Sequence, residues 1–262
     1  MGVRISGPSL AGAVARAGGI GTIASVGLAV ASDIYNGRNY FEANQVVLRQ
    51  DVAEAKKSSK GGIIAVNAMV ALTDYDLHVR SACEGGVDMI ISGAGLPLKL
   101  PELTTGFPDV ALVPIVSSVK AASLIIRRWE KLYGRLPDAL VVETPLYAGG
   151  HLGVTKMEQV FDEAYSLGSV IPELVRYLDE EVGEDIPVIG AGGIWDRDDM
   201  DEVFAMGARG VQMGTRFATT AEGDADTRFK QALIDAGEED VVIIKSPVGI
   251  PGRVLRSPFI EK

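Results

Sequence analysis

The sequence predicts an α/β protein, a (β/α)8 TIM barrel that lacks its first strand in this chain. Three segments support this, because each shows a helical apolar pattern, then glycine, then a short apolar run: 10–25, 77–92 and 200–214. Glycine past the last helical turn takes the left-handed conformation at little cost. An apolar run after it is typical of a strand buried on both faces. Repeated units of this kind predict a parallel sheet.

Seven strands are expected from the apolar runs. They span residues 20–26, 62–69, 87–92, 111–117, 138–143, 186–191 and 209–215. A closed barrel has eight strands, and this chain opens with a loop, MGVRISGPS, that leads directly into a helix. We therefore expect the first strand to lie before Met1. An open doubly wound sheet is the alternative.

Helices are expected between these strands. They span residues 8–17, 39–58, 73–84, 119–133, 169–182 and 196–206, with another near 226–236. Pro8 suits a first helical turn, and Thr73 with Asp76 resembles a capping pair. Pro101 and Pro108 predict that the segment between the strands at 92 and 111 is mostly irregular. Because no linker or low-complexity segment interrupts the pattern, we expect a single domain over residues 1–262.

Composition excludes several classes of partner. The 262 residues are 47% hydrophobic, which suffices for a large core, and the formal charge is −10. An acidic protein repels nucleic acid and anionic lipid, so we expect neither as a partner. The single cysteine, Cys83, cannot form an intramolecular disulfide, which suits the reducing cytoplasm. No apolar run approaches the roughly 18–20 residues that span a bilayer, and we expect a cytoplasmic protein.

Two neighbouring strands end in turns of small residues. IPVIGAGGIWD (186–196) places Gly192 and Gly193 after a buried strand, and ARGVQMGTRF (208–217) places Gly214 and Thr215 after the next one. A tight βα turn explains either motif alone. Glycine turns after the last two strands of a parallel barrel, however, are the usual phosphate site of this architecture.

Further strand ends carry polar side chains. Asn67 ends IIAVNAM and Glu143 ends ALVVE, and each is also explained by an ordinary loop role. His151, in YAGGHLG after Glu143, would face the same mouth, and a neutral imidazole can act as a base. We expect His78 to be a structural helix residue and Cys83 a small buried one. No cluster has metal-ligand spacing.

Together, VVETPLYAGGHLG (141–153), IPVIGAGGIWD and GVQMGTRF resemble the nitronate monooxygenase family, formerly 2-nitropropane dioxygenases. GVRISGPSLAGAVARAGGIGTIASVG (2–27) is similar to that family's opening, and Met1–Gly2 to the tail of its first glycine-rich turn. The resemblance implies an FMN-binding barrel with His151 as catalytic base. It also implies that the following residues contact the flavin or its phosphate: Met1, Gly2, Asn67, Glu143, Gly149, Gly150, Gly192, Gly193, Gln212, Met213, Gly214 and Thr215.

Departures from the family pattern leave alternatives open. Glu143 stands where many members have Gln, and the loop to His151 is one residue longer. SPVGIPGRVLRSPF (246–259) resembles members with a longer C-terminal tail, so we expect shortening at both ends. The leading expectation is oxidation of a nitronate or nitroalkane with O2. An NAD(P)H-dependent enoyl-thioester (enoyl-[acyl-carrier-protein]) reductase, with similar AGGH and GTRF motifs, is the second, and a non-catalytic flavin-binding barrel the third. A homodimer is common for such barrels.

Overall fold

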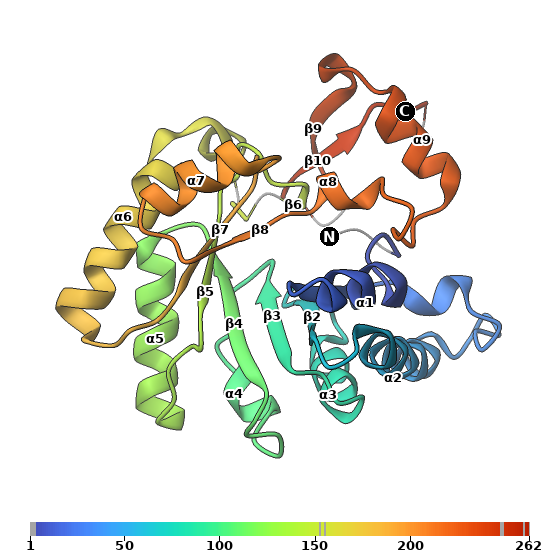
Figure 1. Ribbon diagram of the computed structural model, residues 1–262, viewed down its shortest axis with the longest axis horizontal. Coiled ribbons are helices and arrows are strands. Elements are labelled where there is room, and N and C mark those ends of the chain that lie inside the picture. The colour runs from blue at the N-terminus through green and yellow to red at the C-terminus, as the bar shows by residue number, and fades with distance from the viewer. Residues whose placement is uncertain (1–3, 152, 155, 247–248, 259, 262) are drawn as a thin grey trace. The chain divides into compact units, whose positions relative to one another are not determined.

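The computed structural model describes residues 4–151, 153–154, 156–246, 249–258 and 260–261 (Figure 1). Contacts divide the chain into two compact units. The first comprises Met1–Pro114, Ile125–Asp138 and Thr220–Ala225, and the second comprises Ile115–Leu124, Ala139–Thr219 and Asp226–Lys262. The expectation of a single domain stays a prediction.

The first unit is a parallel sheet covered by helices. Its strands are β1 (Ile20–Ala24), β2 (Ile63–Met69), β3 (Met89–Gly93) and the start of β4 (Ala111–Val116). Its helices are α1 (Pro8–Arg16), α2 (Tyr40–Ser59), α3 (Tyr75–Glu84), the short α4 (Leu100–Leu103) and the 3-10 turn η1 (Leu28–Ala31). α1 packs on β1 and α2, while α3 packs on β2 and α2 (Figure 1).

Glycine lets α1 lie directly against the strands. A Cβ on Gly21 would be 1.8 Å from the Ala11 carbonyl oxygen, and one on Gly62 would be 2.3 Å from that of Ala15. The helix N-terminus is capped from far along the chain, since the Asp224 carboxylate accepts from the N–H groups of Gly7, Ser9 and Leu10 at 2.8, 3.1 and 3.0 Å. These are the donors that a helix leaves without internal partners.

The second unit holds the remaining parallel strands and a small antiparallel sheet. Its parallel strands are the end of β4, β5 (Leu140–Glu143), β7 (Val188–Ala191) and β8 (Gly210–Gln212). The antiparallel strands, in order, are β6 (Gly150–His151), β10 (Pro251–Leu255) and β9 (Val241–Lys245). Its helices are α6 (Leu167–Tyr177) with the π turn Leu178–Val182, α7 (Arg197–Ala205), α8 (Thr215–Ala218) and α9 (Thr227–Asp235). The short 3-10 turns are η2 (Met157–Phe161), η3 (Glu163–Tyr165) and η5 (Glu238–Asp240), and α5 (Val119–Tyr133) belongs to both units.

The parallel sheet confirms the predicted fold class. Its order is β1-β2-β3-β4-β5-β7-β8, so the seven predicted strands follow one another as in a (β/α)8 barrel that lacks one strand. Their predicted bounds agree within three residues. The antiparallel sheet and α4 were not predicted.

Two local predictions were wrong. Thr73 does not begin a capping pair with Asp76, because Asp74 is the N-cap of α3 and its side chain makes no capping bond. The predicted strand 209–215 ends at Gln212, and Thr215 begins α8 instead.

Candidate active site

The turns after β7 and β8 lie next to each other in the second unit. The strands pair in parallel with Ala191 opposite Gln212, so Gly192–Gly193 and Met213–Thr215 leave adjacent strand ends. The loops also touch further out, where the Arg216 guanidinium carbon lies 4.7 Å from the centre of the Trp195 ring. The two sequence-predicted phosphate turns are therefore neighbours.

The loop after β5 packs against the Gly192–Gly193 turn. Both glycines have left-handed φ angles, +101° and +77°. A Cβ on Gly192 would be 2.8 Å from Thr144 Cγ2, and one on Gly193 would be 3.0 Å from the Tyr147 ring. A side chain at Gly192 would thus displace Thr144, and one at Gly193 would displace the Tyr147 ring, on top of the strained backbone.

The same loop turns back onto its own strand end at Gly153. This residue has φ +71°, and a Cβ on it would lie 2.6 Å from Ser117 Oγ and 4.0 Å from Glu143 Oε2. Ser117 follows β4 and Glu143 ends β5, so the loop returns to the carboxyl ends of two adjacent strands. Both ends of the segment that carries His151 are therefore held near the strand ends.

Glu143 has an unusual protonation equilibrium. Burial of its carboxyl group raises its pKa to about 7, because desolvation disfavours the charged form. Near neutral pH the side chain is thus divided between a carboxylate and a neutral acid that can donate a hydrogen bond.

The middle of the loop and the start of α8 have open space. Nothing lies within 4 Å of a Cβ built on Gly149, Gly150 or Gly214. Gly150 has φ +72°, a conformation that favours glycine, and pairs with Arg253 of β10. The backbone there can approach a flat group closely, which fits the flavin that the resemblance implies.

The remaining predicted residues are placed as follows. His151 is the second residue of β6, with its backbone opposite Gly252. Gln212 ends β8. Asn67 lies in β2 of the first unit, where its carbonyl accepts from the Ser25 N–H at 3.2 Å. Met1 and Gly2 fall outside the described residues.

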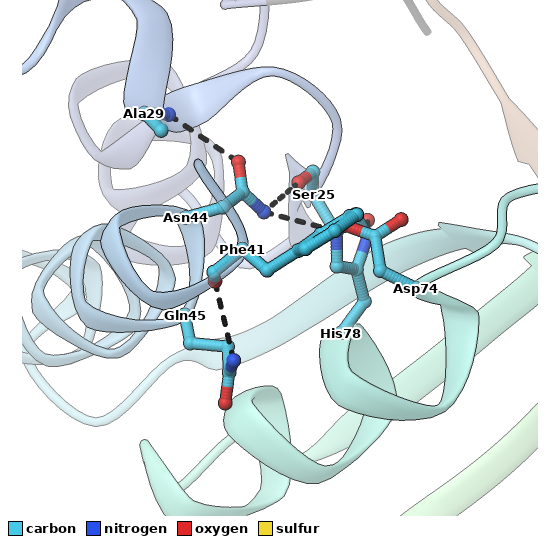
Figure 2. Close-up of polar contacts among 7 residues, drawn as sticks. All are labelled: Ser25, Ala29, Phe41, Asn44, Gln45, Asp74 and His78. Carbon is cyan, nitrogen blue, oxygen red and sulfur yellow. Dashed lines mark hydrogen bonds and ion pairs between the residues drawn. The ribbon is translucent and has the colours of Figure 1, made fainter. Parts of the chain in front are cut away.

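His78 is a structural residue, as expected. It is 1% exposed, and Figure 2 shows it among Ser25, Asn44 and Asp74. Its Nδ1 is 2.9 Å from Ser25 Oγ, and its Nε2 is 2.9 Å from Asp74 Oδ2. Burial lowers the pKa of His78. Nε2 is also 2.9 Å from Asn44 Nδ2. Because a carboxylate can only accept, we assign a neutral ring that donates from Nε2 to Asp74 and accepts from Ser25 at Nδ1.

Cys83 is also buried, and burial raises the pKa of its thiol to about 11, so it is no nucleophile. No set of three or more His, Cys, Asp or Glu within the described residues could hold a metal ion. In that same part of the chain no helix is both long and apolar enough to cross a membrane. A surface depression of about 280 Å³ beside Arg80, Glu84 and Glu102 lies at the C-terminal end of α3 in the first unit.

Sequence reasoning missed several residues of this region. Tyr147 and Trp195 are exposed aromatic side chains on the site loops, and Arg253 reaches the loop from β10. Trp195 directly follows a predicted turn, so the motif itself could have suggested it. Nothing local in the sequence connects Arg253 with a loop more than 100 residues earlier.

The whole chain, residues 1–262, matches the family described as Nitronate monooxygenase. A "Probable nitronate monooxygenase" of Staphylococcus saprophyticus is 32% identical over 124 residues, 47% of this chain and 33% of that protein. The match thus spans only about a third of the relative's length.

Solved structures are similar over nearly the whole chain. FabK from Thermotoga maritima is 28% identical with a TM-score of 0.73, covering 98% of this chain and 70% of that one. A nitroalkane oxidase from Streptomyces ansochromogenes has a TM-score of 0.75 and covers 100% of this chain and 76% of that one. At 21% identity it supports the fold alone.

Proposed function

Because the chain belongs to the nitronate monooxygenase family, we propose that it is an FMN-dependent oxidoreductase that oxidises alkyl nitronates or nitroalkanes with O2. The observation that carries this proposal is the meeting of three loops in the second unit. The loop with His151 packs on the Gly192–Gly193 turn, and that turn lies beside the start of α8. Such loops at the carboxyl ends of parallel strands form the active sites of barrel enzymes.

The described residues fit a flavin. FMN would supply the electron transfer, while the protein supplies position and polarity. Its phosphate would lie at Gly192–Gly193 and Gln212–Thr215, where backbone N–H groups of tight turns suit an anion. Its ring would lie along Gly149 and Gly150, which have open space, with Glu143 at its edge. The flavin contact expected for Asn67 stays a prediction. The Tyr147 ring beside Gly193 is 63% exposed and has room to turn aside.

His151 would move the proton. A neutral imidazole removes the α-proton of a neutral nitroalkane and holds it on a ring nitrogen. With a nitronate, which is already an anion, the protonated ring would orient the substrate instead. The small residues around His151 leave its backbone free to follow the flat surface of the ring.

The test begins with the visible spectrum of the purified protein and aerobic turnover of propionate-3-nitronate without NAD(P)H. We expect His151→Ala to keep the flavin spectrum and lose activity on a neutral nitroalkane by about 100-fold or more. Glu158→Gln is the control, because Glu158 is an exposed carboxylate on the same loop. Unchanged turnover in His151→Ala would remove the histidine from the mechanism.

A second candidate is NAD(P)H-dependent reduction of an enoyl thioester. It is favoured by Gly149-Gly150-His151 and by GTRF (214–217), which resemble the motifs of flavin-dependent enoyl-[acyl-carrier-protein] reductases. NAD(P)H-dependent loss of a crotonyl thioester, with no turnover of the nitronate, would select it. If the protein binds flavin but catalyses neither reaction, the third alternative, a non-catalytic flavin-binding barrel, is supported.

A further inference from the structure

Arg253 of β10 gathers the carbonyl groups of the loop that leads to His151. Its Nη1 donates to the Ala148 carbonyl at 2.6 Å and, at the limit of a hydrogen bond, to that of Pro145 at 3.5 Å. Its Nη2 donates to the Leu146 carbonyl at 2.5 Å. One guanidinium thus binds three carbonyls within four residues of chain.

This contact suits arginine in particular. The guanidinium is planar, stays charged in proteins and carries five N–H donors in a fixed fork. Burial lowers the pKa of Arg253, but its charge persists at any ordinary pH. Within the described part of the chain no carboxylate forms an ion pair with it, so carbonyl dipoles take the place of a counter-ion.

The ends of the loop pack against the Gly192–Gly193 turn and Ser117, and its middle is held by few other hydrogen bonds among the described residues. Inside it, the Ala148 N–H donates to the Thr144 carbonyl at 3.0 Å and closes one turn. After that turn come Gly149 and Gly150, and among the described residues the two-residue strand β6 pairs only with β10. The C-terminal hairpin therefore supplies both the partner strand of His151 and the cation that holds the preceding turn.

An apolar cluster also joins the His151 loop to the β9–β10 hairpin. Ala148, Val154 and Val160 are buried together, with Tyr165 and Ile243 of β9 packed against them. The residues before and after His151 thus share a core with the hairpin. The hairpin therefore supports the loop that carries His151 and is not part of the parallel sheet.

We propose that Arg253 is the positioning residue of the His151 loop, and that the β9–β10 hairpin belongs to the active site by holding that loop in place. The inference rests on the proposed function only in taking His151 as the reacting group. Arg253 itself touches loop carbonyls, and its effect on the reaction passes through the loop.

The test compares three variants of the full chain. Arg253→Met removes the charge and all donors but keeps an unbranched side chain. Arg253→Lys keeps the charge on a single ammonium without the fork. Arg256→Met is the matched control, since Arg256 is an exposed arginine that follows the same strand and donates to the Glu239 carbonyl.

The readout uses the two histidines of the chain, His78 and His151. In Arg253→Met we expect the imidazole NMR signal of His151 to shift and its titration midpoint to move in the flavin-free protein, while the His78 signal stays unchanged. Amide exchange at 146–150 should rise about tenfold or more, the scale of losing one charge-assisted hydrogen bond. With flavin and the nitronate, kcat should fall by about the same factor and KM should change less.

Arg253→Lys should recover part of this loss, and Arg256→Met should show none of it. If Arg253→Met keeps the wild-type His151 signal and the wild-type amide exchange at 146–150, the inference is overturned, whatever the activity of the variant. If Arg253→Lys restores both quantities fully, the guanidinium geometry has no special role. If Arg253→Met does not fold, Arg253→Lys carries the same comparison. If the wild-type protein does not turn over the nitronate, the proposed function is wrong, but the NMR comparison of the variants still tests the role of Arg253.

Discussion

The two units of this chain fix their strand ends in opposite ways. In the first, Ser25 at the end of β1, Asn44 of α2 and the Asp74–His78 pair of α3 bind one another inside the core (Figure 2). In the second, glycines and main-chain carbonyls lie at the strand ends, held by Arg253 and by packing between loops.

The difference shows which unit has polar backbone groups available to bind a ligand. The four side chains of this network in the first unit are at most 9% exposed and already have hydrogen-bond partners: Ser25, Asn44, Asp74 and His78. Gly149, Gly150 and Gly214 of the second unit are exposed and have open space beside them. A buried, satisfied network makes its region rigid, whereas open glycine turns leave backbone groups available. We therefore expect mutations in the first network to affect stability most, and mutations in the second unit's loops to affect chemistry most.

The largest effect on stability should follow from His78→Ala. It leaves the Asp74 carboxylate and the Ser25 hydroxyl buried without their partner, which costs about 3 kcal/mol or more of unfolding free energy. Urea unfolding at pH 7.5 measures this. The control is Leu77→Ala on the same helix, where the leucine is 38% exposed and should cost less than about 1 kcal/mol. Equal losses in the two variants would contradict the contrast between the units.

The same contrast explains what the sequence could predict. The parallel strands were found because apolar runs followed by polar or glycine ends are local signals. His78 and Cys83 were assigned correctly because they lie on a helix with an apolar face. The adjacency of the strand ends that carry Gly192–Gly193 and Gly214 also follows from the order of the strands, and their role as a phosphate site stays a prediction.

Long-range features of the second unit were not predictable. β6 has only two residues and exists because it pairs with β10 about 100 residues later. Contact of Tyr147 with Gly193 depends on the path of a loop that has no periodic pattern. The run VVIIK (241–245) did carry a local signal, since β-branched apolar residues are typical of strands, and it could have revealed β9.

A medium effect is expected from pH, with opposite signs for Glu143 and His78. For Glu143 the folded pKa of about 7 lies above the usual value of 4.5. The native state therefore binds the proton more tightly, and its contribution to stability is full below 4.5 and lost as pH rises through 7. Glu143→Gln should remove this slope and, above pH 7, raise the unfolding free energy by about 1–3 kcal/mol.

His78 gives the opposite slope. Burial lowers its folded pKa, so the unfolded chain binds the proton more tightly, and stability is lost as pH falls below the unfolded value of about 6.5. Urea unfolding of the wild type and Glu143→Gln between pH 5 and 8.5 separates the two groups. With Glu143 replaced, the fall between pH 6 and 7 should disappear. Below pH 6 the rise caused by His78 is opposed by Asp51, because burial raises the pKa of that carboxyl group to about 6. A continued fall between pH 6 and 7 in the variant would show that another group causes it.

The smallest effect concerns the contact between Trp195 and Arg216, which joins the two turns proposed to hold the phosphate. Because Trp195 is 48% exposed, the cation–π contact should contribute only about 0.5–1 kcal/mol in a double-mutant cycle of alanine variants measured by urea unfolding. The control cycle pairs Trp195 with Arg197, which binds Asp201 instead and should show no coupling.

The same cycle can be measured on flavin affinity. If the contact between Trp195 and Arg216 has no part in flavin binding, the coupling energy measured on flavin affinity is zero. If it sets the spacing of the two turns, the coupling appears in affinity as well, because both turns must bind one phosphate at once. Coupling in affinity without coupling in stability would mean that Arg216 meets the phosphate charge directly, and the loops of the second unit would then use a side chain where we expect backbone alone.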